Sequence, residues 1–259
     1  MRYCRFRSAG RVLYGLIESQ SGREVITAAG FSPAQWKKID NFEPLPLAGA
    51  VLVAPVTPSK IICVGRNYRD HAKELGNEIP ERPLLFFKPP SALLAPGGTI
   101  MRPPPEISQR IDFEGELAVV MDKACHHLAD DADVTTYVRG YTAANDVTAR
   151  DLQSRDGQWT RAKGFDTFCP VGPMVSDELD LAAGITLETR LNGEIKQHGD
   201  TRDFIFSLDA IIRFIAQVMT LLPGDLILTG TPAGVAPMQA GDVVEVSIAG
   251  IGTLRNPVI

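Results

Sequence analysis

Three carboxylates occupy alternate positions in the stretch Asp112-Phe113-Glu114-Gly115-Glu116. A β-strand projects alternate residues to one side, so we expect the three to share a face. They lie roughly 6.6 Å apart along a strand, where two unit charges repel by about 2.5 kcal/mol at an effective dielectric of about 20. A half-buried face of this kind requires a cation. An all-oxygen donor set selects Mg²⁺, with Mn²⁺ or Ca²⁺ as alternatives.

The alternative for this stretch is an exposed edge strand, whose charges would prevent aggregation. Two features argue against that alternative. The stretch continues into the apolar run 117–121, which is typical of a strand buried on both faces. Gly115 lies between two of the acids, and a glycine inside a strand often marks the close approach of another backbone. The pattern alone leaves a metal site and an edge strand equally open.

His71 and Glu74 are three residues apart, so on a helix they face the same way. One interpretation is an exposed pair worth only about 0.2–0.5 kcal/mol, which the spacing alone favours. The other is a general base, in which the carboxylate orients the imidazole and the imidazole takes a proton from water. His126, His127 and His198 lie in polar stretches and are expected to be solvated.

Short apolar runs predict the elements that position these residues. Residues 61–64 and 84–87 predict buried strands, and a short helix over 67–75, with Asn67 as its cap, would carry His71. Further strands are predicted over 112–121 and 134–144, and a helical turn over 148–153. Ser207 is expected to cap the one long helix. The apolar stripe of that helix, which predicts core, is Leu208, Ile211, Ile212, Ile215, Val218, Met219 and Leu222.

The chain divides by character near residue 57. Residues 1–57 hold strand-like segments and a connector rich in proline and glycine over 42–49, and they predict a small N-terminal β domain. Residues 58–259 carry the chemistry and end in a hairpin predicted over 243–254. Many short strands with one long helix indicate an α+β, β-rich fold.

Composition excludes several classes of protein. The chain has 259 residues, a net charge of −5 and a pI of about 5.4, which argues against broad nucleic-acid binding. The basic N-terminus lacks the apolar segment of a signal peptide, and no apolar stretch is long enough to span a bilayer, so no membrane partner is expected. The four cysteines form no CxxC pair and are expected to be free thiols, which favours the cytoplasm.

Five motifs, in matching order and spacing from about residue 58 onward, resemble the fumarylacetoacetate hydrolase family. They are Gly65-Arg66-Asn67-Tyr68 with Asp70-His71, Asp112-Phe113-Glu114-Gly115-Glu116-Leu117, Asn145-Asp146-Val147-Thr148-Ala149-Arg150-Asp151, Lys163, and Leu228-Thr229-Gly230-Thr231-Pro232. Within the family, the chain is most similar to the acylpyruvase and oxaloacetate decarboxylase branch. It also resembles the 2-hydroxyhepta-2,4-diene-1,7-dioate isomerase group.

The resemblance implies a mixed β-roll with a variable N-terminal domain, a homodimer, and a bound Mg²⁺ or Mn²⁺ ion. It makes Glu114, Glu116 and Asp146 the metal ligands and leaves Asp112 as a neighbour that does not bind the metal. The other implied roles are Lys163 near the substrate oxyanion, His71 and Glu74 as the water-activating pair, Gln153 beside the attacking water, and Arg150 and Thr231 near the substrate carboxylate.

The leading hypothesis is a Mg-dependent hydrolase that cleaves the C–C bond of 3-acyl 2-oxo acids, of the acylpyruvate or fumarylpyruvate type, through an enolate at the metal. The intact set of His71, Glu74 and Gln153 motivates it. Decarboxylation of oxaloacetate, or isomerisation of 2-hydroxyhepta-2,4-diene-1,7-dioate, would use the same metal site without an attacking water. A metal-binding protein without turnover is the third hypothesis.

Overall fold

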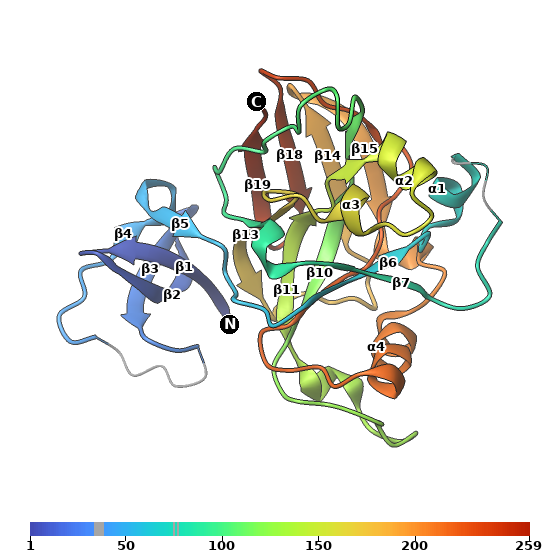
Figure 1. The fold of residues 1–259 in the computed structure, drawn as a ribbon. Coiled ribbons are helices and arrows are strands. Elements are labelled where there is room, and N and C mark those ends of the chain that lie inside the picture. The colour runs from blue at the N-terminus through green and yellow to red at the C-terminus, as the bar shows by residue number, and fades with distance from the viewer. Residues whose placement is uncertain (34–38, 75, 77) are drawn as a thin grey trace.

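The computed structural model describes residues 1–33, 39–74, 76 and 78–259. Within these residues the chain forms the β-rich α+β fold that the sequence predicted, with three sheets and few helices (Figure 1). The strands are β1 (Arg2–Ser8), β2 (Arg11–Gln20), β3 (Arg23–Gly30), β4 (Leu45–Pro46), β5 (Val51–Val53), β6 (Ile61–Gly65), β7 (Leu84–Lys88), β8 (Leu93–Leu94), β9 (Ile111–Phe113), β10 (Gly115–Met121), β11 (Val138–Asn145), β12 (Thr148–Ala149), β13 (Cys169–Ser176), β14 (Thr186–Leu191), β15 (Glu194–Asp200), β16 (Leu226–Leu228), β17 (Ala236–Pro237), β18 (Val243–Ile248) and β19 (Gly252–Pro257). The α-helices are α1 (Arg69–Glu74), α2 (Arg150–Arg155), α3 (Thr160–Lys163) and α4 (Leu208–Val218).

The acidic strand β10 lies inside the largest sheet, whose order is β4-β3-β2-β1-β13-β11-β10-β16-β6-β7, with β5 beside β1 and β8 beside β13. β10 is antiparallel to both of its neighbours, β11 and β16. The edge-strand alternative is therefore wrong. A four-stranded sheet, β15-β14-β18-β19, and a three-stranded sheet, β12-β9-β17, complete the fold.

The N-terminal strands β1–β5 form a lobe at one side of the molecule (Figure 1). The lobe shares its hydrogen-bonded sheet with the rest of the chain, because β1 pairs with β13 through Arg2 opposite Ser176 and Tyr3 opposite Val175. The division near residue 57 stays a prediction.

Two predicted strands differ in extent. The strand predicted over 112–121 is two strands, because Glu114 between them bonds to a side chain: its N–H donates to Asn145 Oδ1 at 2.9 Å. The strand predicted over 134–144 begins only at Val138, after a 3₁₀ turn (Val134–Tyr137) that starts at Asp133. Residues 148–153 are divided between β12 and α2.

The helix α4 begins at its predicted cap, since Ser207 Oγ accepts a hydrogen bond from Ala210 N at 3.2 Å. Only some residues of its predicted apolar stripe are buried in the core. The buried members are Ile211, Ile212 and Ile215. Val218 is 63% exposed and Leu222 is 40% exposed, because the helix ends at Val218 and the backbone becomes extended at Met219.

The four cysteines are free, as predicted, and all four are buried. They lie on or beside strands of the largest sheet: Cys4 on β1, Cys63 on β6, Cys125 after β10 and Cys169 at the start of β13. In the part of the chain that the structure describes, no helix has the length and apolar character needed to cross a membrane.

Candidate metal centre and active site

Three buried carboxylates meet at one point of the largest sheet. Glu114, Glu116 and Asp146 each contribute an oxygen, and these oxygens lie within 4.8 Å of one another. None of the three residues is more than 5% exposed. They are the residues that the sequence predicted as metal ligands, and three oxygen donors at this spacing can hold a divalent cation.

Strand pairing brings the three carboxylates together. β10 and β11 pair with Gly115 opposite Asn145, so Glu114 and Asp146 flank the same pair of residues, and Asp146 N donates to Glu114 O at 2.8 Å. Glu116 Oε2 accepts a hydrogen bond of 2.6 Å from Gly230 N, two residues beyond the end of β16. Three adjacent strands therefore fix the carboxylate cluster.

The three buried carboxylates differ in how far neighbouring groups neutralise their negative charge. Burial raises the pKa of Glu116 well above its usual range, and the charges of Asp146 and Glu114 raise it further. Asp146 Oδ1 has no hydrogen-bond partner among the described residues, although Lys88 Nζ lies 2.8 Å away in an ion pair. A bound cation would lower the raised pKa of Glu116 and would give Asp146 Oδ1 a further partner, so the residues fit a divalent metal.

Glu114 is the better-compensated carboxylate. Burial would raise its pKa, but the positive charges of Lys163 and Arg150, with a smaller contribution from His71, hold the pKa well below its usual value. The surroundings of Glu114 therefore favour its anionic form, whereas those of Glu116 favour its protonated form when no cation is bound.

Two buried lysines hold the cluster from one side. Lys163, at the end of α3, donates to Glu114 Oε2 at 2.8 Å and to Asp146 Oδ2 at 2.6 Å. Burial would lower the pKa of this ammonium, but Asp146 and Glu114 raise it above its usual value. Lys88, at the end of β7, donates to the carbonyl oxygens of Val147 (3.0 Å) and Lys163 (2.6 Å) besides its ion pair with Asp146.

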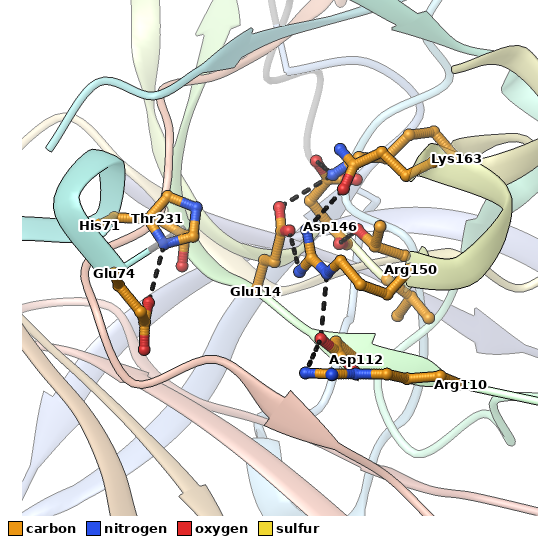
Figure 2. Close-up of polar contacts among 12 residues, drawn as sticks. His71, Glu74, Arg110, Asp112, Glu114, Asp146, Arg150, Lys163 and Thr231 are labelled. Carbon is orange, nitrogen blue, oxygen red and sulfur yellow. Dashed lines mark hydrogen bonds and ion pairs between the residues drawn. The ribbon is translucent and has the colours of Figure 1, made fainter. Parts of the chain in front are cut away.

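Arg150, the first residue of α2, links the cluster to its neighbours (Figure 2). Its guanidinium donates to Glu114 Oε1 at 2.6 Å, to Asp112 Oδ2 at 3.0 Å and to Gln153 Oε1 at 2.7 Å. Asp112 also accepts a hydrogen bond of 3.0 Å from Arg110 Nε. Two arginines thus neutralise Asp112, which lies outside the carboxylate cluster.

His71 and Glu74 form a pair on α1 that is not the exposed pair its spacing favoured. His71 is only 5% exposed, and its Nδ1 lies 3.1 Å from Glu74 Oε2. Glu74 Oε1 accepts a hydrogen bond of 2.9 Å from Gly234 N, so the carboxylate is itself held in place. Figure 2 shows the imidazole facing Glu114, with Glu74 on its far side.

The helix that carries His71 begins at Arg69, and Asn67 is not its cap. The Asn67 side chain instead donates to Thr229 O at 2.8 Å and accepts from Phe206 N at 2.8 Å. Residue 75, where the sequence predicted the end of this helix, lies outside the described residues.

Thr231 is held by a buried glutamine. Its Oγ1 donates to Gly115 O at 2.8 Å and accepts a hydrogen bond of 2.8 Å from Gln197 Nε2. Gln197 Oε1 in turn accepts from Gly115 N at 2.9 Å. The Thr231 hydroxyl is therefore used to position the start of β10, between the two glutamates.

A cavity of about 290 Å³ gathers the site residues. The sequence-predicted residues that line it are His71, Glu114, Glu116, Asp146, Arg150, Gln153, Lys163 and Thr231. Glu74 lies behind His71. Phe86 and Trp159, whose ring centroids are 5.2 Å apart, form an apolar wall.

Three residues at or beside the cavity received no role from the sequence. Lys88 ends an apolar strand directly before two prolines, an unusual place for a charge and a signal that could have marked it as buried. Arg66 lines the cavity and belongs to the motif Gly65-Arg66-Asn67-Tyr68, but its position in that motif does not predict a role for its side chain. Gln197 lies on β15, far from the quoted motifs along the chain, and no local sequence pattern indicates a role for it.

Known proteins resemble this chain over the region that contains the site. Residues 60–259 match the family model described as fumarylacetoacetate (FAA) hydrolase C-terminal, and residues 1–55 match the model described as Rv2993c-like, N-terminal. Protein Rv2993c of Mycobacterium tuberculosis is 50% identical over 216 residues, covering 83% of this chain and 80% of the relative. Oxaloacetate tautomerase YisK of Bacillus subtilis is 40% identical over 260 residues, covering 94% of this chain and 86% of the relative.

A solved structure extends the likeness to the whole chain. The crystal structure of 2-hydroxyhepta-2,4-diene-1,7-dioate isomerase from Mycobacterium marinum is 42% identical and superimposes with a TM-score of 0.88, covering 100% of this chain and 98% of the other. The family model covers the strands, the carboxylate cluster and the cavity described above. The chain therefore belongs to the fumarylacetoacetate hydrolase family of enzymes.

Proposed function

We propose that this enzyme interconverts the enol and keto forms of a small 2-oxo acid, with a divalent cation held by the carboxylate cluster. One observation carries the proposal: His71, oriented by Glu74, faces that cluster inside a single cavity. Relatives named for oxaloacetate tautomerisation and for dienedioate isomerisation support it, since both reactions move a proton through an enolate. The all-oxygen donor set favours Mg²⁺, with Mn²⁺ or Ca²⁺ as alternatives.

The cavity suits the charge that enolisation creates. Removal of a proton from C3 of a 2-oxo acid leaves negative charge on the 2-oxo oxygen. A bound divalent cation would supply Lewis-acid stabilisation of that charge. The Lys163 ammonium, buried beside Glu114 and Asp146, adds a fixed positive charge in a site of low dielectric, where it acts more strongly than in water.

His71 is the group that we assign to the proton. The contact of its Nδ1 with Glu74 fixes the ring, and the imidazole lines the cavity and faces Glu114 (Figure 2). A neutral imidazole in this orientation accepts the C3 proton and becomes imidazolium. It then returns the proton to C3 or to the 2-oxo oxygen, so no other proton donor is required.

Hydrolysis of the C–C bond of a 3-acyl 2-oxo acid is the second candidate, because Gln153 lines the cavity together with His71. That reaction needs a water held for attack. Gln153 Oε1 already accepts a hydrogen bond from Arg150, so one lone pair of this oxygen and the amide N–H groups are left for a water. Enol–keto interconversion needs no such water, and we therefore place it first. Decarboxylation of oxaloacetate would pass through the same enolate.

A panel of 2-oxo acids with product identification, in the presence of Mg²⁺, tests the proposal. We expect the wild-type enzyme to accelerate ketonisation of enol-oxaloacetate. His71→Gln should lower that rate by about 10²–10⁴-fold, the usual contribution of a positioned acid–base group. His198→Gln, an exposed histidine on β15, is the matched control and should leave the rate unchanged.

Thermal stabilisation by Mg²⁺ separates the proton-transfer role from the cation site, and His71→Gln should retain it. A wild-type ketonisation rate in His71→Gln would contradict the assignment. Faster release of pyruvate from acetylpyruvate than ketonisation of oxaloacetate would favour the hydrolase. Zero turnover on every compound would favour a metal-binding protein without activity.

A further inference from the structure

Arg66 is a cationic side chain of the cavity that the proposed reaction does not use. It lines the same cavity as His71 and the carboxylate cluster, and it is partly exposed. Its guanidinium makes no hydrogen bond or ion pair with any residue that the structure describes. The other two cations of the cavity differ in this respect, because Arg150 and Lys163 are both bound to carboxylates.

The backbone holds Arg66 in a conformation that few side chains adopt. Its φ is +57°, in the left-handed region that favours glycine. The next residue, Asn67, holds the backbone in this turn, because it is fully buried and hydrogen-bonded on several sides. Its side chain bonds to Thr229 and Phe206, and its carbonyl oxygen accepts from Ile205 N at 2.8 Å. Strained non-glycine residues held in this way cluster at ligand-binding sites.

The segment that follows β16 packs closely against the turn at Arg66. A Cβ added at Gly230 would lie 2.7 Å from Asn67 Cβ and 3.2 Å from Val64 O, so the chain after β6 packs directly on the segment that follows β16. The turn at Arg66 therefore follows from close backbone packing, and the side chain it presents to the cavity is an arginine where glycine would be less strained.

The charge of the cavity points to the ligand that this arginine would bind. Three carboxylates and three cationic side chains line the cavity. A divalent cation in the cluster gives the lining an excess of about two positive charges, which a dianion would neutralise. A planar guanidinium without a partner matches a carboxylate through two parallel N–H donors.

We propose that Arg66 binds a second carboxylate of the substrate, so that the enzyme prefers 2-oxo dicarboxylic acids to 2-oxo monocarboxylic acids. The inference rests on the proposed function, in which a cation held by the carboxylate cluster stabilises the 2-oxo end of the substrate. The cavity volume of about 290 Å³ suits a short dicarboxylate that spans from the cluster to Arg66.

Two inert compounds provide the test. N-oxalylglycine and N-ethyloxamate share the 2-oxo acid end and differ at the far end, where the first has a carboxylate and the second a methyl group. Binding is measured by calorimetry with Mg²⁺ present. We expect the wild-type enzyme to bind N-oxalylglycine about ten- to a hundredfold more tightly, the usual range for one charge-assisted hydrogen-bonded pair.

Arg66→Gln should remove this preference and leave the affinity for N-ethyloxamate unchanged. Arg66→Lys keeps the charge and should retain part of the preference. Unchanged affinity of Arg66→Gln for N-ethyloxamate shows that the loss of preference does not come from misfolding. Arg69→Gln is the matched control, an exposed arginine three residues away that does not line this cavity. It should retain the full preference.

The outcomes separate this inference from the function on which it rests. Equal wild-type affinity for the two compounds, or an unchanged preference in Arg66→Gln, would overturn the inference alone. An equal loss of affinity for both compounds in Arg66→Gln would overturn it as well, because the arginine would then shape the site without binding the second carboxylate. Failure of the wild-type enzyme to bind either compound would overturn the proposed function together with the inference.

Discussion

At Glu116, burial and two neighbouring carboxylates oppose the ionised form, and they raise the pKa of the carboxyl well above 4.5. A raised pKa means that the folded protein holds a proton which the unfolded chain has lost. In the metal-free protein, the contribution of Glu116 to stability is therefore fully present below pH 4.5 and is lost as the pH rises through the folded-state pKa. A bound cation would take the place of that proton.

Glu116→Gln should stabilise the metal-free protein and abolish its response to Mg²⁺. The amide keeps an oxygen that can accept from Gly230 N and removes the buried charge. We expect the gain to grow with pH above 4.5, by at most about 1.4 kcal/mol for each pH unit between the two pKa values. Denaturant unfolding of the chelator-treated protein at pH 5 and pH 8, with and without added Mg²⁺, measures both effects.

Glu194→Gln is the control for this prediction, because its side chain is 73% exposed on β15. It should change neither the stability nor the Mg²⁺ response. A Glu116→Gln protein that gained as much stability from Mg²⁺ as the wild type would exclude Glu116 as a ligand.

Single residues differ in how far the sequence could predict them. The alternating acids could be found, because strand geometry turns a spacing of two into a shared face. The partners of those acids could not, since the ion pair of Lys88 with Asp146 joins residues that are 58 positions apart along the chain and meet only when β7 and β11 are assembled. That Arg66 has no partner among the described residues likewise depends on every element around the cavity.

The strand β10 packs against β14 of the four-stranded sheet at Gly115. A Cβ added there would lie 2.0 Å from Thr189 Oγ1, a buried hydroxyl with no hydrogen-bond partner among the described residues. The glycine between the two glutamates thus marks a close approach, but of a side chain and not of the backbone that the sequence predicted. The approaching group is a side chain of another sheet, which strand periodicity does not reveal.

Gly115→Ala should destabilise the protein by about 1–3 kcal/mol, because the added methyl group overpacks the contact with Thr189. It should also weaken the Mg²⁺ response, since Glu114 and Glu116 flank the displaced residue. Thr189→Ala removes the hydroxyl that clashes and should alone cost less than about 1 kcal/mol. A double-mutant cycle by urea unfolding should therefore show Gly115→Ala to be less harmful in the Thr189→Ala background.

Gly49→Ala is the matched control, because an added Cβ there meets no atom within 4 Å. It should be close to neutral. Additive effects of Gly115→Ala and Thr189→Ala would contradict the proposed contact between the two sheets.

Local patterns predicted which elements exist better than they predicted where the elements end. The long helix α4 is capped by Ser207, as its sequence indicated. The apolar stripe predicted for it continues beyond the last helical residue, because the spacing of apolar residues does not show where a helix ends. The strand over 112–121 is interrupted for a related reason. Asn145 comes from a distant part of the chain and competes for a backbone N–H of Glu114.

Across the whole molecule, the N-terminal lobe and the catalytic region share one sheet. Tyr3 on β1 is 1% exposed and packs in one cluster with Val171 and Val175 of β13. Without β1, the outer edge of β13 and these apolar side chains would face solvent, and an unpaired edge readily pairs with another chain.

A protein consisting of residues 58–259 should therefore unfold at a lower temperature than the full chain and should form soluble aggregates. Size-exclusion chromatography with light scattering, together with thermal unfolding, measures both, with the full chain treated in the same way as control. A monodisperse truncated protein with an unchanged midpoint would show that the lobe contributes nothing to the sheet. The homodimer implied by the family resemblance stays a prediction, which the same chromatography would measure.

The buried cysteines have a practical consequence for following this molecule. Burial raises the pKa of the thiols of Cys4 and Cys169 to about 12, and that of Cys63 well above its usual value. Alkylating reagents attack the thiolate, so these three side chains are inert until the surrounding strands separate. Because they lie on β1, β6 and β13, the rate at which each acquires a label would time the opening of its own strand. The native chain thus carries its own reporters of local unfolding, with no engineered probe required.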